Sequence, residues 1–273
     1  MAYKVLDLYK DLPLTNCGDC GKGGCFAFAS AAYLEGASLA LCPHLEPGKR
    51  DAMEAKLEQG RARGDGRRPE SSEQAFAFLK GKLAQADFAG LARASGAVYE
   101  SGPPEALLLD FLGARHRLTR DDVEALQGEE PTVWVKIFLA IYVTRASGAP
   151  PAGEWAAYRE LPNTVSKARS FEACGGKVAD GFRGRTGDLD AACRGVGGVP
   201  TAFGSADRAY LLPALPRVSL VLLYWEPQEE FGARATFLVD RGVLEYLDQE
   251  ALVFLAEATT QRLLGKGLAE VIP

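Results

Sequence analysis

The sequence has few of the groups on which most catalytic sites depend. Its 273 residues include only two histidines, His44 and His116, so a Ser–His–acid or Cys–His–acid set cannot be assigned. Nucleotide-binding motifs are also missing. The glycines of residues 18–24 lack the phosphate-loop pattern, and those of residues 195–198 are followed by Val199 and Pro200, which does not match the dinucleotide fingerprint. The sequence therefore does not indicate ATP- or NAD-dependent chemistry.

Long hydrophobic runs and an excess of basic residues are absent as well. The best apolar stretch, Val133–Val143, is about half of the roughly 20 residues that a membrane helix needs, and it contains Lys136. Charged residues interrupt the N-terminal stretch, which does not resemble a secretory signal, so we expect a cytoplasmic protein. The formal net charge of −5 argues against general nucleic-acid binding. We expect neither a membrane nor a nucleic acid as a partner.

Cysteine, in contrast, occurs in a pattern. Four of the six cysteines fall close together with the spacing Cys-x2-Cys-x4-Cys-x16-Cys: Cys17, Cys20, Cys25 and Cys42. In a reducing compartment such a group is more typical of a metal site than of disulfides. Two short intervals place three thiolates on one tight loop, and the fourth returns from a distance. This is how a chain encloses a cubane iron–sulfur cluster.

The residues around these cysteines favour the same interpretation. Glycines at positions 18, 21, 23 and 24 permit positive φ angles and leave backbone N–H groups free to face anionic sulfur. Residues 26–35 favour a helix that ends at Gly36, which places a helix N-terminus beside Cys25. A segment of about 45 residues has too few apolar side chains to fold well alone, and a metal centre would supply the missing core.

Two other metal centres stay open as alternatives. Four cysteines can hold a structural zinc ion, but the common zinc arrangement has two Cys-x2-Cys pairs and this sequence has one. Four cysteines can also hold a [2Fe–2S] cluster, whose plant-type motif has these spacings in the reverse order. The spacing favours [4Fe–4S] over both.

The cysteine segment also resembles a known motif. The residues that carry the resemblance are Leu12 to Gly21, Cys25 to Ala29, Gly36, and the pair Cys42-Pro43. They resemble the [4Fe–4S] motif in the large subunit of corrinoid iron–sulfur proteins of the acetyl-CoA pathway, and the B subunit of the Rnf electron-transport complex carries a similar motif. The resemblance covers about 40 residues and implies that Cys17, Cys20, Cys25 and Cys42 are the cluster ligands. The remainder is similar to an uncharacterised domain that follows this motif in anaerobic bacteria and archaea, and that family implies no known activity.

The two histidines and the other cysteines are further candidates. His44 follows Cys42 by two residues; we expect it to face solvent, the other interpretation being that it lines the cluster or serves as an alternative ligand. His116 lies on a predicted strand and is expected at the surface. Cys174 and Cys193 could form a second metal or redox pair, but the absence of other soft ligands between them favours ordinary buried thiols.

A group of carboxylates flanks a predicted hairpin: Glu226, Glu229, Glu230 and Asp240. Paired carboxylates could bind a metal or act as acid and base. A solvated turn explains them equally well.

The patterning predicts a mixed α+β fold. We expect helices at residues 49–59 (with Met53 and Leu57 on one side), 72–94, from 121, 131–146, 166–179, around 189–193, and after a capping Asp248. We expect strand pairs at residues 106–119, turning near Gly113, and at residues 217–226 with 234–240. Helices mixed with local hairpins, without βαβ alternation, are typical of the α+β class.

The domain organisation follows from a shift in composition. Residues 59–69 are rich in Gly and Arg without apolar periodicity, which indicates a flexible linker. We therefore expect a small [4Fe–4S] module over residues 1–46, a helix and linker over residues 47–72, and a larger domain of mixed helices and antiparallel hairpins over residues 73–273.

Three hypotheses for function follow. The first is a redox protein of anaerobic metabolism whose [4Fe–4S] cluster passes single electrons to a redox partner protein, with a corrinoid-dependent system as a specific case. The second makes the larger domain an enzyme or cofactor binder that the cluster supplies with electrons; buried polar residues that converge in one pocket would favour it. The third is a regulatory or assembly factor that senses cluster status.

Overall fold

The chain forms two compact units. The computed structural model describes residues 5–62, 71–228, 231–269 and 271. The division falls between Met1–Ser71 and Ser72–Pro273, and each unit has an apolar core of its own. No helix among the described residues combines the length and apolar character that crossing a bilayer requires.

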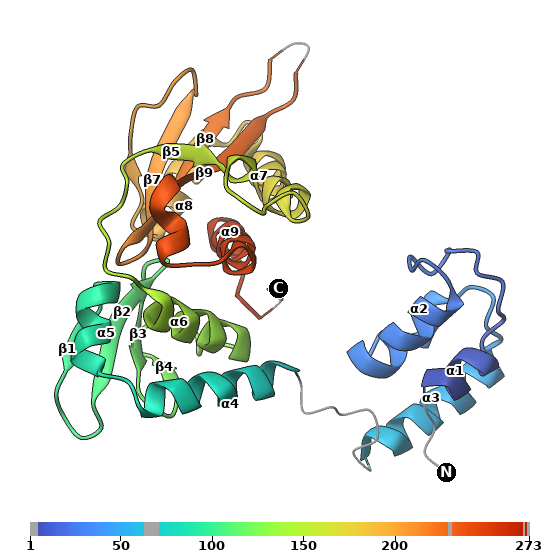
Figure 1. Cartoon of the computed structure of the whole chain (residues 1–273). Helices are drawn as coiled ribbons and strands as arrows, with labels where there is room; N and C mark the ends of the chain where they lie inside the picture. The colour runs from blue at the N-terminus through green and yellow to red at the C-terminus, as the bar shows by residue number, and fades with distance from the viewer. Residues whose placement is uncertain (1–4, 63–70, 229–230, 270, 272–273) are drawn as a thin grey trace. The chain divides into compact units, whose positions relative to one another are not determined.

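The small unit is helical (Figure 1). Its elements are α1 (Val5–Asp11), α2 (Cys25–Ser30), the π-helical turn η1 (Ala31–Glu35), the 3-10 turn η2 (Leu39–Leu41) and α3 (Pro47–Ala62). Helix α2 begins at Cys25 and the helical stretch ends at Gly36, whose φ of 76° is left-handed, so the predicted helix and its glycine stop are confirmed. In α3, Met53 and Leu57 are buried as predicted.

The predicted linker starts too early. Helix α3 continues to Ala62 and therefore takes in the first residues of the 59–69 stretch. The remainder of that stretch lies outside the described residues, and the flexible linker stays a prediction.

The core of the small unit includes sulfur. It is built from buried side chains of α1, α2 and α3 and of the segments between them: Leu8, Leu12, Cys25, Phe28, Ala29, Ala32, Leu39, Leu45, Met53 and Leu57. Cys20 and Cys42 are partly buried and pack against this core. Three of the four clustered cysteines therefore take part in the packing that holds this unit together.

The larger unit combines helices with two antiparallel sheets, which confirms the α+β class (Figure 1). Its α-helices are α4 (Ser71–Ala84), α5 (Phe88–Ser95), α6 (Val133–Arg145), α7 (Ala168–Phe182), α8 (Thr186–Gly195) and α9 (Gln249–Leu263). One sheet has the order β1 (Val98–Glu100), β2 (Ala106–Phe111), β3 (Ala114–Leu118), β4 (Val123–Ala125). The other has the order β5 (Trp155–Ala157), β9 (Arg234–Asp240), β8 (Val218–Trp225), β7 (Arg208–Leu215), β6 (Val199–Pro200). Short 3-10 turns, η3 (Tyr158–Glu160) and η4 (Arg241–Glu245), follow β5 and β9.

Both predicted strand pairs form. Strands β2 and β3 pair from Leu107↔Leu118 to Phe111↔Ala114, and Gly113 turns the chain with a φ of 80°. Strands β8 and β9 pair with Trp225 opposite Arg234. The central position of β8, between β7 and β9, explains its nearly continuous apolar sequence.

Helices α6 and α9 lie in the core of the larger unit. Their rings form a continuous contact, because Phe138 of α6 lies 5.2 Å from Phe111 of β2 and 4.9 Å from Phe254 of α9, measured between ring centroids. The predicted cap of α9 is confirmed, since the Asp248 carboxylate accepts a 2.9 Å hydrogen bond from the backbone N–H of Ala251.

Two helix predictions are wrong in their extent or type. The predicted 72–94 helix is two helices, because the Arg120 guanidinium donates hydrogen bonds to the carbonyls of Leu83, Ala84 and Ala86 at the end of α4. The segment from Asp121 is a turn that leads into strand β4. The Thr119 hydroxyl accepts from two backbone N–H groups there and closes a hairpin onto β3.

Helix α7 packs very closely on the second sheet. A Cβ atom placed on Gly175 would lie 2.3 Å from the carbonyl oxygen of Ala235 in β9, which is far inside van der Waals contact. Only glycine fits at this crossing of helix and strand.

Candidate functional site

The loop between α1 and α2 has an unusual backbone. Five of its residues have positive φ angles, and two of these are not glycine: Leu14, Asn16, Gly18, Gly21 and Gly24. A 2.8 Å hydrogen bond from the N–H of Gly21 to the carbonyl of Gly18 tightens the turn that carries Cys20. Such a succession of left-handed residues turns backbone N–H groups toward the inside of a loop, which suits an anionic centre.

Asn16 ties this loop to the start of α2. Its side-chain carbonyl accepts a 2.9 Å hydrogen bond from the backbone N–H of Cys25, and its own backbone N–H donates to the Cys25 sulfur at 3.4 Å. The pair of bonds fixes the Cys25 thiol against the loop that contains Cys17 and Cys20. Asn16 was found by the motif resemblance, but its bonds to Cys25 could not be read from the sequence.

The four clustered cysteines are all free, and their exposure differs. Cys25 is buried, and Cys20 and Cys42 are half-buried against the apolar core of the small unit. Cys17 is exposed, and its sulfur accepts a 3.4 Å hydrogen bond from the Thr15 hydroxyl. The structure thus places three of the predicted ligands at the core and one at the surface.

The exposed thiol lies beside two other groups that bind metals. One ligand atom each from Cys17, Asp19 and His44 lies within 4.8 Å of the other two. The His44 ring nitrogen Nε2 contacts the Asp19 carboxylate at 2.8 Å, and the two side chains are 46% and 53% exposed. The hydrogen bond from His44, with a smaller contribution from Cys17, holds the pKa of Asp19 below its usual value. His44 therefore faces solvent as expected, while it contacts the cysteine loop.

The four sulfurs are not grouped as closely as the ligands of a single metal ion. Among the described residues, which include all four cysteines, no three of these sulfur atoms lie within 4.8 Å of one another. The donor chemistry nevertheless fits an iron–sulfur group, because four free thiols lie in one short segment, three of them at an apolar core and all near a loop rich in positive φ angles.

His116 is not on the surface, and that prediction is wrong. Strand β3 alternates, so Arg115 is exposed and Arg117 partly exposed, while His116 is only 2% exposed and packs beside Phe111. Its Nδ1 contacts the carbonyl of Ala114 at 3.0 Å. Burial lowers the pKa of His116 below its usual value.

Cys174 and Cys193 are buried thiols, as expected. They belong to different helices, α7 and α8. Burial raises the pKa of Cys174 to about 11 and that of Cys193 to about 12. Neither sulfur is suited to act as a nucleophile or metal ligand in this state.

The carboxylates of the β8–β9 hairpin serve the backbone. Asp240 accepts hydrogen bonds from the N–H groups of Ala152, Gly153 and Gly242 at 2.7 to 2.9 Å. These bonds hold the chain that enters β5. Glu229 and Glu230 lie outside the described residues, so the paired-carboxylate hypothesis has no observation in its favour.

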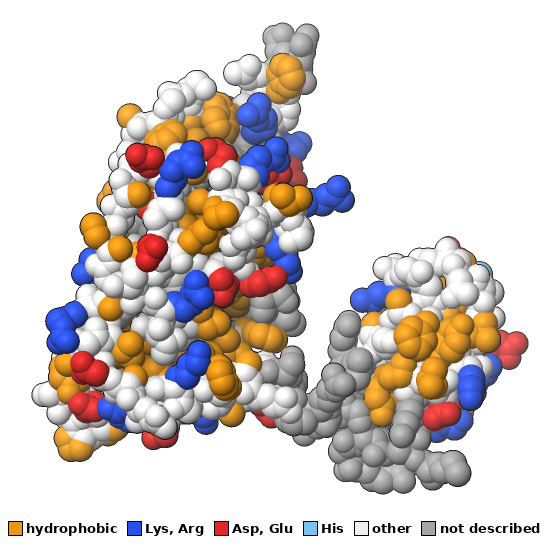
Figure 2. Space-filling model, viewed as in Figure 1, with side chains coloured by type: hydrophobic (Ala, Val, Ile, Leu, Met, Phe, Trp, Pro, Cys, Tyr) orange, Lys and Arg blue, Asp and Glu red, His pale blue; other side chains and the backbone are white. Residues whose placement is uncertain are grey.

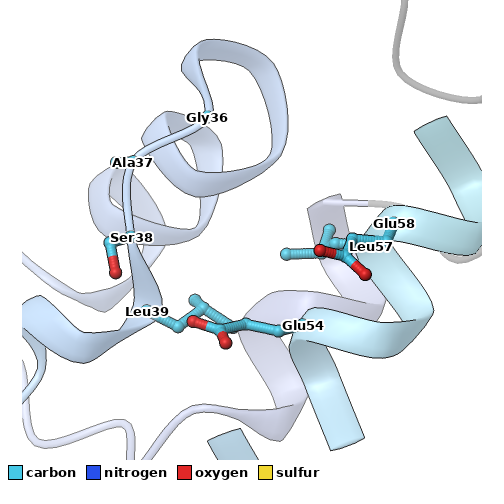
Figure 3. A pocket seen from close by; sticks show the side chains of 7 residues that line it. All are labelled: Gly36, Ala37, Ser38, Leu39, Glu54, Leu57 and Glu58. Carbon is cyan, nitrogen blue, oxygen red and sulfur yellow. The ribbon is translucent and has the colours of Figure 1, made fainter. Parts of the chain in front are cut away.

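Cavities in either unit are modest. The larger unit has an open cavity of about 380 Å³ where the β2–β3 turn meets the C-terminal ends of α8 and α9. Its only charged lining side chain is Arg262, which pairs with Glu129 at 3.6 Å. The small unit has a pocket of about 190 Å³ between residues 36–39 and α3, lined by the carboxylates Glu54 and Glu58 and by none of the clustered cysteines (Figure 3). Neither of these two cavities has a convergent set of buried polar side chains.

Several large apolar side chains are exposed on the small unit. They include Leu6, Leu14, Phe26 and Leu41. Figure 2 shows hydrophobic side chains gathered on the visible face of this unit, whereas charges of both signs are mixed on the visible face of the larger unit. Leu41 directly precedes Cys42, and Leu14 lies three residues before Cys17, so exposed apolar surface adjoins the cysteines along the chain.

Comparisons with known proteins agree with the motif. Residues 12–44 match a family model described as "Putative Fe-S cluster". A 50-residue stretch is 44% identical to the corrinoid/iron-sulfur protein large subunit of Moorella thermoacetica. That stretch is 18% of this chain and 11% of the relative, so the chain spans only a small part of that protein. The resemblance to corrinoid iron–sulfur proteins is confirmed over this segment.

The larger unit is matched differently. No solved structure shows a significant match to the chain. Residues 87–262, which make up more than half of the chain and lie entirely in the larger unit, match a single family model. The chain therefore belongs to the family described as "Domain of unknown function (DUF3786)", and it carries an iron–sulfur type segment ahead of that domain.

Proposed function

We propose that this chain is an iron–sulfur electron-transfer protein. In this proposal the small module of residues 1–46 holds a [4Fe–4S] cluster on four thiolates, those of Cys17, Cys20, Cys25 and Cys42. The observation that carries it is the packing of the cysteines: three free thiols lie at one apolar core, and the fourth lies on the left-handed loop that borders it. The bound cluster would supply one-electron chemistry at modest structural rearrangement.

The spacing of the sulfur atoms supports a polynuclear centre. A single zinc ion binds sulfur at about 2.3 Å, so its four tetrahedral ligands lie roughly 3.8 Å from one another. No three of the clustered sulfurs are within 4.8 Å of one another. This does not match the mutually close sulfurs of a single tetrahedral ion, whereas a cubane, whose ligands bind four different irons, does not require such closeness.

The chain's own residues would tune and expose this centre. The backbone N–H of Asn16 donates to the Cys25 sulfur, and such hydrogen bonds raise the reduction potential of iron–sulfur clusters. The buried side of the site excludes water, whereas Cys17 lies at the surface. The exposed Cys17 corner would be the side from which electrons enter or leave.

A corrinoid-dependent system is the specific redox partner that we propose. The support is the 44% identity to a corrinoid/iron-sulfur protein large subunit over 50 residues. The exposed Leu14 and Leu41 beside the cysteines offer apolar contact area for a partner protein.

The test is a metal analysis of anaerobically purified protein. We expect about four irons and four sulfides per chain, and an electron paramagnetic resonance signal of a reduced cluster with one unpaired electron. The Cys42→Ala variant should lose most of the iron, whereas Cys193→Ala, which removes a buried thiol of the larger unit, should keep it. Stoichiometric zinc without iron would refute the proposal. Rapid mixing of the reduced protein with a cob(II)alamin-loaded corrinoid protein then tests the choice of partner.

A further inference from the structure

The exposed corner of the cysteine site has more ligand atoms than a four-cysteine cluster uses. Cys17, Asp19 and His44 each place one metal-binding atom within 4.8 Å of the others. The other three clustered cysteines have no histidine in such a group among the residues that the structure describes. Cys17 therefore differs from the other three clustered cysteines in two ways: it is exposed, and its sulfur lies beside a histidine and a carboxylate.

His44 is positioned to reach a metal that Cys17 holds. A metal ion binds a thiolate at about 2.3 Å and an imidazole at about 2.0 Å, so two ligands of one tetrahedral ion lie roughly 3.5 Å apart. The Cys17 and His44 ligand atoms already lie within 4.8 Å of each other, so a modest side-chain movement would bring them to that separation. The His44 side chain is 46% exposed, which leaves it room to move.

The surroundings of His44 favour imidazole over carboxylate as the reaching ligand. Asp19 accepts the hydrogen bond from His44 Nε2 and so holds the ring over the loop that bears Cys17. Imidazole is a common ligand of iron, whereas carboxylate prefers harder ions. Asp19 thus holds the ring beside Cys17 before the exchange, and this contact is released when His44 Nε2 turns to the iron.

We propose that His44 is a second ligand for the iron at the Cys17 corner and can take the place of Cys17 there. This inference rests on the proposed [4Fe–4S] function. In the exchange, the bond between iron and Cys17 Sγ breaks and a bond between iron and His44 Nε2 forms. The His44 ring keeps one proton, which moves through solvent from Nε2 to Nδ1, so it binds as a neutral imidazole. The Cys17 sulfur takes up one proton from water and leaves as a neutral thiol, and no electron is transferred.

The exchange changes the charge of the cluster. A thiolate carries one negative charge and a neutral imidazole carries none, so the histidine-bound form is easier to reduce. The cluster would therefore have two reduction potentials, a lower one with Cys17 bound and a higher one with His44 bound.

The experiment compares variants of the full chain, purified without oxygen. Cys17→Ala should retain a four-iron cluster with at least half of the wild-type iron, and its pulsed paramagnetic resonance spectrum should show coupling to nitrogen that changes with isotopically labelled histidine. Cys17→Ala with His44→Gln should lose about tenfold in iron occupancy, and added imidazole should restore part of it. Cys20→Ala is the matched control, and it should lose its cluster whether or not His44 is present.

The outcomes separate the two proposals. If wild-type protein contains no iron–sulfur cluster, the proposed function fails and this inference fails with it. If the wild type has its cluster but Cys17→Ala contains as little iron as the double variant, or shows no nitrogen coupling, only the role of His44 is refuted. Tryptophan fluorescence verifies folding of the larger unit in every variant, because Trp134, Trp155 and Trp225 all lie there.

Discussion

The two units of this chain achieve stability in different ways. The larger unit buries apolar side chains from two sheets and from the helices that pack on them. The small unit has no strand among its described residues, and its short core contains one thiol and borders two more. Burial of apolar surface stabilises the larger unit. In the small unit, metal-binding groups lie where further apolar side chains would otherwise be needed.

The backbone shows the same contrast. Between α1 and α2, five positive φ angles fall within eleven residues, including Leu14 and Asn16, which pay a conformational penalty that glycine does not. Such a loop is stable when something inside it compensates for the penalty. The comparison teaches that the two units differ in how their backbones are held, and it agrees with the proposed function, in which an iron–sulfur cluster completes the small unit.

Removal of the cluster should have the largest effect and should affect one unit only. Cys25→Ala deletes the buried thiol that Asn16 holds, and the energy that metal binding supplies to small domains is on the order of 10 kcal/mol. We expect amide hydrogen exchange in residues 5–62 to approach that of an unfolded chain, while the larger unit keeps its protection. Protection of the small unit that is unchanged in iron-free Cys25→Ala protein would contradict the contrast.

A cavity in the larger unit should have the converse effect. Leu252 of α9 is fully buried, so Leu252→Ala should lower the free energy of unfolding of that unit by about 2 to 5 kcal/mol. Denaturant titration followed by tryptophan fluorescence measures this, and the visible absorption of the cluster should stay at its wild-type intensity. Leu126→Ala is the matched control, because Leu126 is 47% exposed and its loss should change the value by less than about 0.5 kcal/mol.

A smaller effect should appear with pH. Burial lowers the pKa of His116 in the folded state, so the unfolded chain binds a proton more readily than the folded one once the pH falls below about 6.5. The larger unit should therefore lose stability as the pH falls further, by at most about 1.4 kcal/mol per pH unit from this group. His116→Gln should flatten that part of the curve obtained from tryptophan fluorescence. If the free energy of unfolding falls with pH at the same slope in the wild type and in His116→Gln, groups other than His116 cause the loss of stability in acid.

The sequence predicts the elements whose signals are local. The β2–β3 and β8–β9 hairpins, helix α6 and the Asp248 cap of α9 follow from apolar runs, turn residues and a capping side chain that lie close together in the chain. The break after α4 does not follow from local signals, because Arg120, which binds the Ala84 carbonyl there, lies 36 residues away in the chain. Strand β7 was missed since Pro213 lies within it at an irregularity in its pairing with β8, and proline argues against a strand.

The candidate site divides in the same way. Spacing alone identifies the four cysteines, because the motif is contained in one short segment. The contact between Asp19 and His44 joins residues 25 positions apart, and nothing in the composition of either neighbourhood signals it. The burial of His116 could have been recognised from the alternation of Arg115 and Arg117 around it, which places the histidine on the opposite face of β3.

The glycine in helix α7 has a consequence for how the larger unit tolerates oxidants. Because the carbonyl of Ala235 would contact any side chain at position 175, helix and sheet meet there at the minimum distance that two backbones allow. Cys174, the residue before it, is fully buried. A sulfenic or sulfinic acid at Cys174 would need room for added oxygen that this packing does not contain, so the thiol should survive oxidative damage for as long as the unit stays folded.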